Sequence, residues 1–249
     1  LGLTDEEIIG RTKFCIHPEN SFKNVTVIGG TKNVNIEKIK SIKDIQLLLS
    51  EKNQGLAANI NKGINACKGN YILYCQEDFL IVKDIELILN ELYFVLDNNK
   101  LDLVRLRANY SFPFLNKITN NVFEIPKFSW KNFLYNAFQY SDNLFITTPS
   151  FFVKNGLYLE NTSGDYGEAE YAIRIFNSKA KIGITKRYYS QDVVGSESVM
   201  RKISAEIKRK NKLTKKLKQY LRAFRLHIER LLYNPQKRGL VTYKNKRRK

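Results

Sequence analysis

The chain has 249 residues, of which 43% are hydrophobic, so it is long enough to bury one substantial core with a tail left over. No apolar run approaches the roughly 18 residues that a membrane-spanning helix needs. The formal net charge of +18 is concentrated after residue 200, where 19 Lys and Arg residues accompany two acidic residues. We therefore predict a nearly neutral globular domain, residues 1–200, and a basic extension, residues 201–249.

The histidines and cysteines narrow the chemistry further. His17 and His227 lie in unrelated contexts, which argues against a His-built metal site or a Ser-His-Asp triad. Cys15, Cys67 and Cys75 are odd in number and fit neither a disulfide framework nor zinc-ligand spacing. We expect all three to pack as small apolar residues in a reducing compartment.

The beginning of the chain predicts one helix and two strands. Residues 5–16 have a helical pattern, with Thr4 as the candidate cap and Glu7 three residues later. Residues 25–28 and 45–49 are apolar runs of strand length.

The most informative stretch begins at Asn53. Leu56, Ile60 and Ile64 recur every four residues, so they predict a helix with one apolar stripe. Gly55 stands where this helix should begin. Glycine is a common residue at helix boundaries because it accepts backbone angles that other residues avoid.

A short buried strand, residues 71–75, follows and leads into an acidic pair, Glu77 and Asp78. Ligands of open α/β sheets bind at the carboxyl ends of the strands. Carboxylate oxygens in that position suit a divalent cation that also contacts phosphate oxygens and water. The stretch therefore predicts a metal-nucleotide site, although the acidic pair could instead be only the polar cap of the next turn.

Helices and strands continue to alternate after the acidic pair. Residues 84–96 form an amphipathic helical pattern, and residues 101–106 and 181–184 predict further strands. This alternation predicts an α/β fold: a three-layer α/β/α sandwich with a mostly parallel central sheet. Residues 109–140 are rich in aromatic side chains, including Trp130, and predict a hairpin or irregular lobe, whose flat apolar rings could also stack on a ligand.

Two later segments carry candidate polar groups. Asp142 precedes an apolar strand pattern and could bind a ligand or simply cap a turn. Residues 164–174 place Asp165, Glu168 and Glu170 near the start of a predicted helix. The helix dipole stabilises a carboxylate there. Such a carboxylate could act as a general base, or it could merely complement the dipole.

The central stretch, the strand pattern after Asp142 and the segment before Arg174 together resemble the family 2 glycosyltransferases of the GT-A fold. The matching positions in the central stretch are Asn53, Gly55, Asn61, Gly63, Gly69, Tyr71, Ile72 and Asp78. The chain departs from the family in several places, including Asn59-Ile60, where the family often has Ala-Arg. It has Gln76-Glu77-Asp78 where the family has Asp-x-Asp or Asp-Asp, and Gly29-Gly30 where the family often has a base-contacting Asp. No opening strand of the family kind is visible, so we expect a chain that lacks its first strand.

The resemblance implies transfer of a sugar from a nucleotide-sugar, with UDP as the expected nucleotide, to a hydroxyl of a glycan or lipid-linked acceptor. It implies a Mn²⁺ or Mg²⁺ ion held by Asp78, with Glu77 second and Asp192 as the nearest third ligand. The residues expected to contact the donor are Asn53, Gly55, Asn61, Glu77 and Asp142.

The resemblance also implies an inverting mechanism with a single carboxylate base. Aligned on Arg174, the family's catalytic carboxylate falls on Glu168, and its preceding Glu falls on Gly167. Asp165 and Glu170 are the alternatives for the base.

The basic extension predicts a long helix over residues 201–233. Five apolar residues recur in steps of four and three and define an apolar seam between basic faces: Leu217, Leu221, Phe224, Ile228 and Leu231. We expect this helix to lie on an anionic membrane. The protein would then be cytoplasmic and bound peripherally to the inner face of the cell membrane. Alternatively, the seam packs on the globular domain. Nucleic acid would attract the same charge, but the chain has no recognisable nucleic-acid-binding motif.

Two rival functions stay open at this point. A sugar nucleotidyltransferase has a related fold, but it would need a Gly-rich phosphate loop after its first strand. A degenerate glycosyltransferase domain could serve as a membrane- or nucleic-acid-binding module. In the family a His often supplies the third metal ligand, and residues 187–200 contain no His. This absence, the Gly29-Gly30 pair and the absent first strand favour the second rival.

Overall fold

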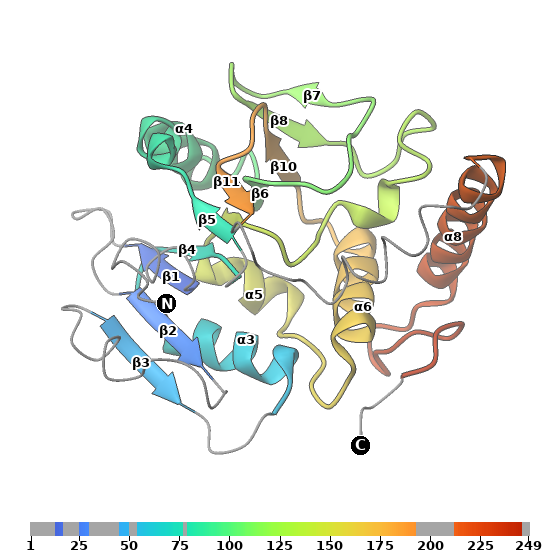
Figure 1. Cartoon of the computed structure of the whole chain (residues 1–249), viewed down its shortest axis with the longest axis horizontal. Coiled ribbons are helices and arrows are strands. Elements are labelled where there is room, and N and C mark those ends of the chain that lie inside the picture. The colour runs from blue at the N-terminus through green and yellow to red at the C-terminus, as the bar shows by residue number, and fades with distance from the viewer. Residues whose placement is uncertain are drawn as a thin grey trace.

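The computed structural model describes residues 13–16, 25–29, 45–49, 54–76, 79–192 and 212–245. In these residues a sheet of nine strands has the order β3-β2-β1-β4-β9-β6-β10-β8-β7, with helices around it (Figure 1). Its strands are β1 (Lys13–Ile16), β2 (Val25–Gly29), β3 (Ile45–Leu49), β4 (Tyr71–Tyr74), β6 (Leu103–Arg105), β7 (Asn116–Lys117), β8 (Val122–Ile125), β9 (Phe145–Thr147) and β10 (Ile182–Thr185). A separate pair joins β5 (Phe79–Ile81) to β11 (Ser190–Asp192).

The sheet is mixed, with one dominant strand direction. The pairings give β2, β3, β4, β6, β7 and β10 one direction, and β1, β8 and β9 the other. Only the pairs β2–β3 and β6–β10 are parallel neighbours among these strands. Because β4, β6 and β10 share a direction, their carboxyl ends lie at the same edge of the sheet.

Helices cover both faces of the sheet. They are α3 (Leu56–Ala66), η1 (Lys83–Ile85), α4 (Glu86–Asp97), η2 (Asn136–Phe138), α5 (Pro149–Asn155), α6 (Gly164–Asn177) and α8 (Lys212–Leu232). Neighbouring strand residues alternate between two core clusters: Leu73 packs with α4, and Ile72 packs with α3, α5 and α6. This alternation follows from the two-residue period of a strand. It confirms the predicted three-layer α/β/α arrangement.

Most predicted elements are present, with a clear error at the start of the chain. The helix expected over residues 5–16 is wrong for residues 13–16, which form β1 between β2 and β4. The hydrogen bonds of two neighbouring strands outweigh the weak local helical pattern at this position. Asp192, expected in a loop, lies in β11.

The cysteine prediction holds for one described residue and fails for another. Cys75 is buried at the end of β4, and its thiol is not in a disulfide. Cys67, which follows α3, is disulfide-bonded. An odd number of cysteines therefore did not exclude a disulfide, because one of three can stay reduced.

Helix α8 packs against α6 at one end of the molecule (Figure 1). Leu226, Tyr233 and Leu240 join Ile173 and Phe176 in a third core cluster. The apolar seam is on another face of α8. Leu217, Leu221, Phe224 and Leu231 are 61%, 61%, 60% and 83% exposed, so the alternative that the seam packs on the globular domain is wrong for these residues. Among the described residues, no helix combines the length and apolarity needed to cross a membrane.

Candidate active site

The acidic motif lies only partly within the described residues. Asn53, Glu77 and Asp78 are outside them, as is the side chain of Asp192. The backbone register of β5 and β11 pairs Asp192 with Phe79, the residue directly after Asp78. The register therefore places the backbone of Asp192 opposite the residue that follows the acidic pair in the sequence.

This register is compatible with the predicted metal centre. Carboxylates from two paired strands supply the hard oxygen ligands that Mn²⁺ and Mg²⁺ prefer. Among the described side chains, no group of three His, Cys, Asp or Glu residues could hold a metal ion. Arg107 lies beside the strand pair: its guanidinium is 4.5 Å from the Phe79 ring centroid and donates to the Ser190 carbonyl at 3.4 Å. The sequence analysis did not identify Arg107.

Helix α3 begins as the glycine pattern predicted. Gly55 has a φ of +90°, a backbone conformation that residues with a side chain rarely adopt. Asn61 is buried on this helix. Its side-chain amide donates to the Tyr158 carbonyl at 3.0 Å and to the Glu160 carboxylate at 2.7 Å, and its oxygen accepts from the Tyr158 N–H at 2.9 Å. Asn61 thus holds the chain segment that follows α5.

A small pocket lies between α3, α6 and the segment that joins α5 to α6. Its free volume of about 180 Å³ includes open solvent, and this pocket has no enclosed space large enough for a water molecule. Its lining includes Leu56, Ile60, Asp142, Tyr158, Gly164 and Glu168. Two sequence-predicted site residues, Asp142 and Glu168, therefore share this pocket, although 26 positions separate them.

Asp142 and Glu168 are held in a hydrogen-bonded group. The Asp142 N–H donates to Glu168 Oε1 at 3.2 Å. The Asp142 carboxylate accepts from the Tyr158 hydroxyl at 2.7 Å and from the Tyr140 hydroxyl at 3.2 Å. Burial raises the pKa of Tyr158 well above its ordinary value, and the Glu168 charge acts in the same direction. Tyr158 therefore stays protonated and donates to Asp142.

A buried cation lies beneath this group. Arg105 is fully buried and donates to the Phe138 carbonyl at 2.7 Å and to Ser141 Oγ at 2.8 Å. Burial lowers the pKa of Arg105 to about 10, whereas the Glu168 carboxylate opposes that shift. The guanidinium therefore stays charged at neutral pH and offsets the charge of the Glu168 carboxylate. The sequence pattern predicted Arg105 only as part of a strand.

Helix α6 begins earlier than Glu168. Its first residue is Gly164, so Asp165 occupies the exposed first turn and Glu168 the second turn, where it reaches the pocket. Gly167 explains a departure from the family pattern. A Cβ at this position would approach Thr162 Oγ1 to 2.8 Å, so the close packing of α6 on the preceding segment leaves no room for the family's Glu.

The comparisons with known proteins agree with this architecture. Residues 29–157 match Glycosyl transferase family 2. No curated protein matches the chain. Solved structures of S. aureus TarS 1–349 superpose with a TM-score of 0.53 at 15% identity, over 89% of this chain and 66% of TarS 1–349. TarS 1–349 in complex with UDP-GlcNAc gives 0.52 at 15%, over 89% and 67%, and its UDP complex gives 0.53 at 16%, over 89% and 66%.

The structural likeness shows the fold, and the chain spans about two thirds of the length of these TarS structures. It confirms the predicted GT-A architecture. The family match covers more than half of the chain. The protein belongs to glycosyl transferase family 2.

Proposed function

We propose that the protein is an inverting glycosyltransferase that moves a sugar from a UDP-sugar to a hydroxyl of a glycan or lipid-linked acceptor. The observation that carries this proposal is the pairing of Asp142 and Glu168 at one pocket, above the buried Arg105. UDP as the nucleotide is supported by the S. aureus TarS structures, which contain UDP-GlcNAc and UDP.

Glu168 is the proposed general base. One of its oxygens accepts the Asp142 N–H, and the half-buried carboxylate lines the pocket, where the acceptor hydroxyl would approach it. Glu168 takes the proton from the acceptor hydroxyl as the hydroxyl oxygen bonds to the anomeric carbon. The bond between that carbon and the diphosphate oxygen breaks, and UDP leaves with the electron pair. Asp165 is the less favoured base because it is exposed and does not line the pocket.

The donor side of the proposal rests on the acidic motif. Asp78 and Glu77 would hold Mn²⁺ or Mg²⁺ together with Asp192, whose backbone pairs beside Phe79. The bound ion would neutralise charge on the departing diphosphate. The proposed donor contacts are Asn53, Gly55, Asn61, Glu77 and Asp142. The amide of Asn61 already contacts Tyr158 and Glu160, so we assign it to support of the donor site.

Calorimetric titration of UDP with and without Mn²⁺ tests the donor site. Binding should require the metal, and Asp78→Asn should remove most of it because the amide lacks the charge that holds the cation. Asp84→Asn is the matched control, since Asp84 makes only an exposed ion pair with Arg187. Absence of UDP binding at any metal concentration would favour a degenerate binding module.

Analysis of the reaction products distinguishes a glycosyltransferase from a sugar nucleotidyltransferase. A transferase releases UDP from a UDP-sugar when an acceptor is present. Synthesis of a UDP-sugar from UTP and a sugar phosphate would instead identify a nucleotidyltransferase.

We also propose that the apolar seam docks the protein on an anionic membrane at the cytoplasmic face, where a lipid-linked or cell-surface polysaccharide acceptor is assembled. The specific observation is the exposure of the seam on a helix rich in Lys and Arg. Trp130 is 79% exposed. It lies in the aromatic lobe that contacts α8 through His227, whose ring stacks on Phe133 at 4.7 Å. Exposed Trp beside a basic amphipathic helix is typical of an interfacial surface.

Sedimentation with vesicles of graded anionic lipid content tests this docking. The double variant Leu221→Gln/Phe224→Gln should bind vesicles less than the parent does. Leu87→Gln is the matched control, because Leu87 is an 80% exposed leucine on α4. Equal binding by the double variant and the parent, or binding that ignores lipid charge, would refute the proposal. High salt should weaken capture without abolishing it, because apolar burial is not screened.

A further inference from the structure

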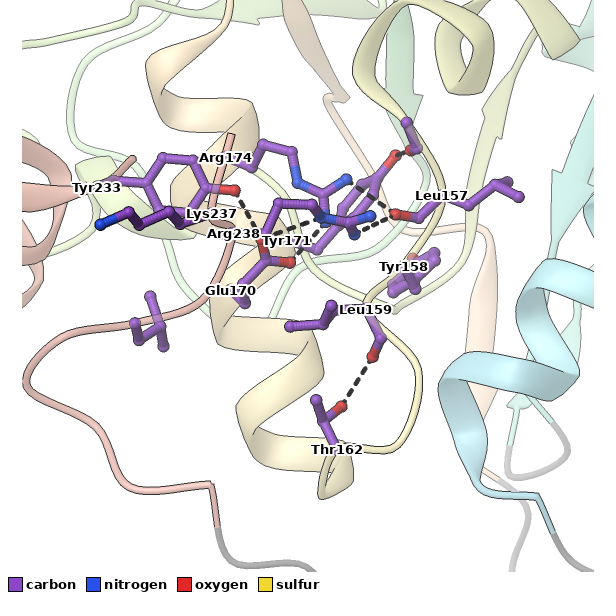
Figure 2. Close-up of polar contacts among 12 residues, drawn as sticks. Leu157, Tyr158, Leu159, Thr162, Glu170, Tyr171, Arg174, Tyr233, Lys237 and Arg238 are labelled. Atoms are coloured by element: carbon purple, nitrogen blue, oxygen red, sulfur yellow. Dashed lines mark hydrogen bonds and ion pairs between the residues drawn. The ribbon is translucent and has the colours of Figure 1, made fainter. Parts of the chain in front are cut away.

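The segment after α8 returns to α6, where its side chains contact Glu170 and the Leu157 carbonyl (Figure 2). Its contact point on α6 is Glu170, which is fully buried. The Glu170 carboxylate accepts from Arg174 Nη2 at 2.5 Å and from the Tyr233 hydroxyl at 2.6 Å, and Arg238 Nε is 3.9 Å away. Two residues of the C-terminal segment therefore converge on one buried carboxylate.

Arg238 also contacts the segment that precedes α6. Its Nη2 donates to the Leu157 carbonyl at 2.6 Å. The same carbonyl accepts from Arg174 Nη1 at 2.8 Å, and Arg174 Nη1 also donates to the Asn155 carbonyl at 3.0 Å. Figure 2 shows both guanidinium groups pointing at Leu157 from the side of α6. Arg238 thus links α6 to the beginning of the pocket segment, which we define as residues 157–163.

The far end of the pocket segment has a second link to the C-terminus. The Ser163 N–H donates to Asn245 Oδ1 at 3.1 Å, and Asn245 Nδ2 donates to the Asn161 carbonyl at 3.4 Å. In the middle, the Tyr166 hydroxyl accepts from the Leu240 N–H at 2.7 Å. The C-terminal segment therefore lies along α6 and hydrogen-bonds to the pocket segment at both of its ends.

The pocket segment positions the groups proposed for catalysis. Its Tyr158 donates to the Asp142 carboxylate, and the Asp142 N–H holds Glu168. From the opposite side, Asn61 of α3 fixes the backbone of Tyr158. Residues of the basic extension therefore support, through the pocket segment, the hydrogen bonds that hold the proposed base Glu168. The sequence spacing did not predict this support.

We propose that residues 233–245 are a positioning element of the active site, with Arg238 as its main contact. The hydrogen-bond partners that remain without Arg238 distinguish a role in positioning the active site from a role in general stability. Without Arg238, Glu170 keeps Arg174 and Tyr233, so its charge stays compensated. The Leu157 carbonyl keeps Arg174 Nη1 but loses the shorter of its two hydrogen bonds, which should loosen the backbone next to Tyr158, the residue that donates to Asp142.

The experiment compares Arg238→Gln with Lys237→Gln, a neighbouring variant that loses the same charge at an exposed side chain. Hydrogen exchange is measured peptide by peptide, and turnover of UDP-sugar is measured on the same preparations. In Arg238→Gln, we expect several-fold faster exchange confined to residues 157–163. We also expect kcat/KM for the acceptor to fall about tenfold, since small misplacements of reacting groups are costly. UDP affinity should stay within about twofold, and Lys237→Gln should match the parent.

A third variant, Arg238→Lys, tests the role of the guanidinium fork. Lysine keeps the charge but cannot contact Glu170 and Leu157 together, so exchange and turnover should lie between the parent and Arg238→Gln. Unchanged exchange in residues 157–163 would overturn the proposal. So would faster exchange across all of the strands, which would indicate a purely structural role.

The turnover measurement rests on the proposed glycosyl transfer, whereas the exchange measurement does not. A parent without turnover would refute the proposed function. Localised exchange in Arg238→Gln would still support positioning of the pocket segment in that case.

Discussion

Two glutamates on opposite sides of α6, Glu168 and Glu170, have the same carboxylate group in different surroundings. On the pocket side, Glu168 is half-buried, lines the pocket and accepts from the Asp142 backbone N–H. On the support side, two residues later, Glu170 is fully buried and bonded to Arg174 and Tyr233. A carboxylate that keeps an available oxygen can exchange a proton with a substrate. One whose oxygens are both engaged can only hold structure, and this difference rules out Glu170 as a convincing alternative base.

The largest expected effect is on the pocket side. Glu168→Gln should lower the rate of sugar transfer by roughly 10²- to 10⁴-fold, because the amide cannot accept the acceptor's proton. UDP affinity should be kept, and the free energy of unfolding should change by less than about 1 kcal/mol, since Gln Oε1 can still accept the Asp142 N–H. Asp165→Asn, on the exposed first turn, is the control for charge. Full activity in Glu168→Gln would move the base to Asp165.

On the support side, substitution of Glu170 should mainly lower the free energy of unfolding. Glu170→Gln leaves Arg174 buried without its anionic partner, so the free energy of unfolding should fall by about 3 kcal/mol. Urea unfolding followed by circular dichroism measures this fall. Glu170→Gln and Glu168→Gln are the same chemical change on one helix. Equal stability of the two variants would contradict the assigned division of roles.

Helix α8 offers a third contrast, between its packed face and its apolar seam. Leu226→Ala should lower the free energy of unfolding by about 2–4 kcal/mol, because Leu226 is 3% exposed in the core cluster that joins α6 and α8. Leu221→Gln should change it by less than about 0.5 kcal/mol, because Leu221 is 61% exposed. Thermal unfolding of both variants measures the contrast, and comparable losses would place the seam in the core.

The smallest expected effect is a pH dependence on the support side. Lys127 donates to the Ile175 carbonyl of α6 at 2.6 Å. Burial, and secondarily Arg230, lower the pKa of Lys127 from 10.5 to about 8. Between these values the unfolded chain binds a proton that the folded chain does not, so the Lys127 contribution to stability rises with pH. From pH 8 to about 9.5 the gain should be about 1 kcal/mol relative to Lys127→Met.

The exposed Lys131→Met serves as the control for that titration. Above pH 10 the sign should reverse. Tyr158 and Tyr171 have pKa values raised by burial, so the unfolded chain loses protons that the folded chain keeps. A parent and Lys127→Met with parallel pH curves would show that the amine titrates normally.

Several features followed from the sequence because they depend on local pattern. The spacing of Leu56, Ile60 and Ile64 predicted α3, and Gly55 marked its first turn. Five apolar residues in a basic run predicted α8 and its seam. Short-range periodicity reports which face of an element is apolar, but it does not report which neighbour covers that face.

The tertiary structure decided the partners. The sequence determined that α8 has an apolar seam, whereas packing decided that Leu226 and Tyr233 face α6 and that the seam stays exposed. The sequence placed Glu168 and Glu170 on one helix, and only folding gave Glu170 a hydroxyl from Tyr233, 63 positions away. Contacts across such separations depend on the placement of whole elements. A local pattern therefore specifies the helix, and the assembled core specifies what each of its side chains can do.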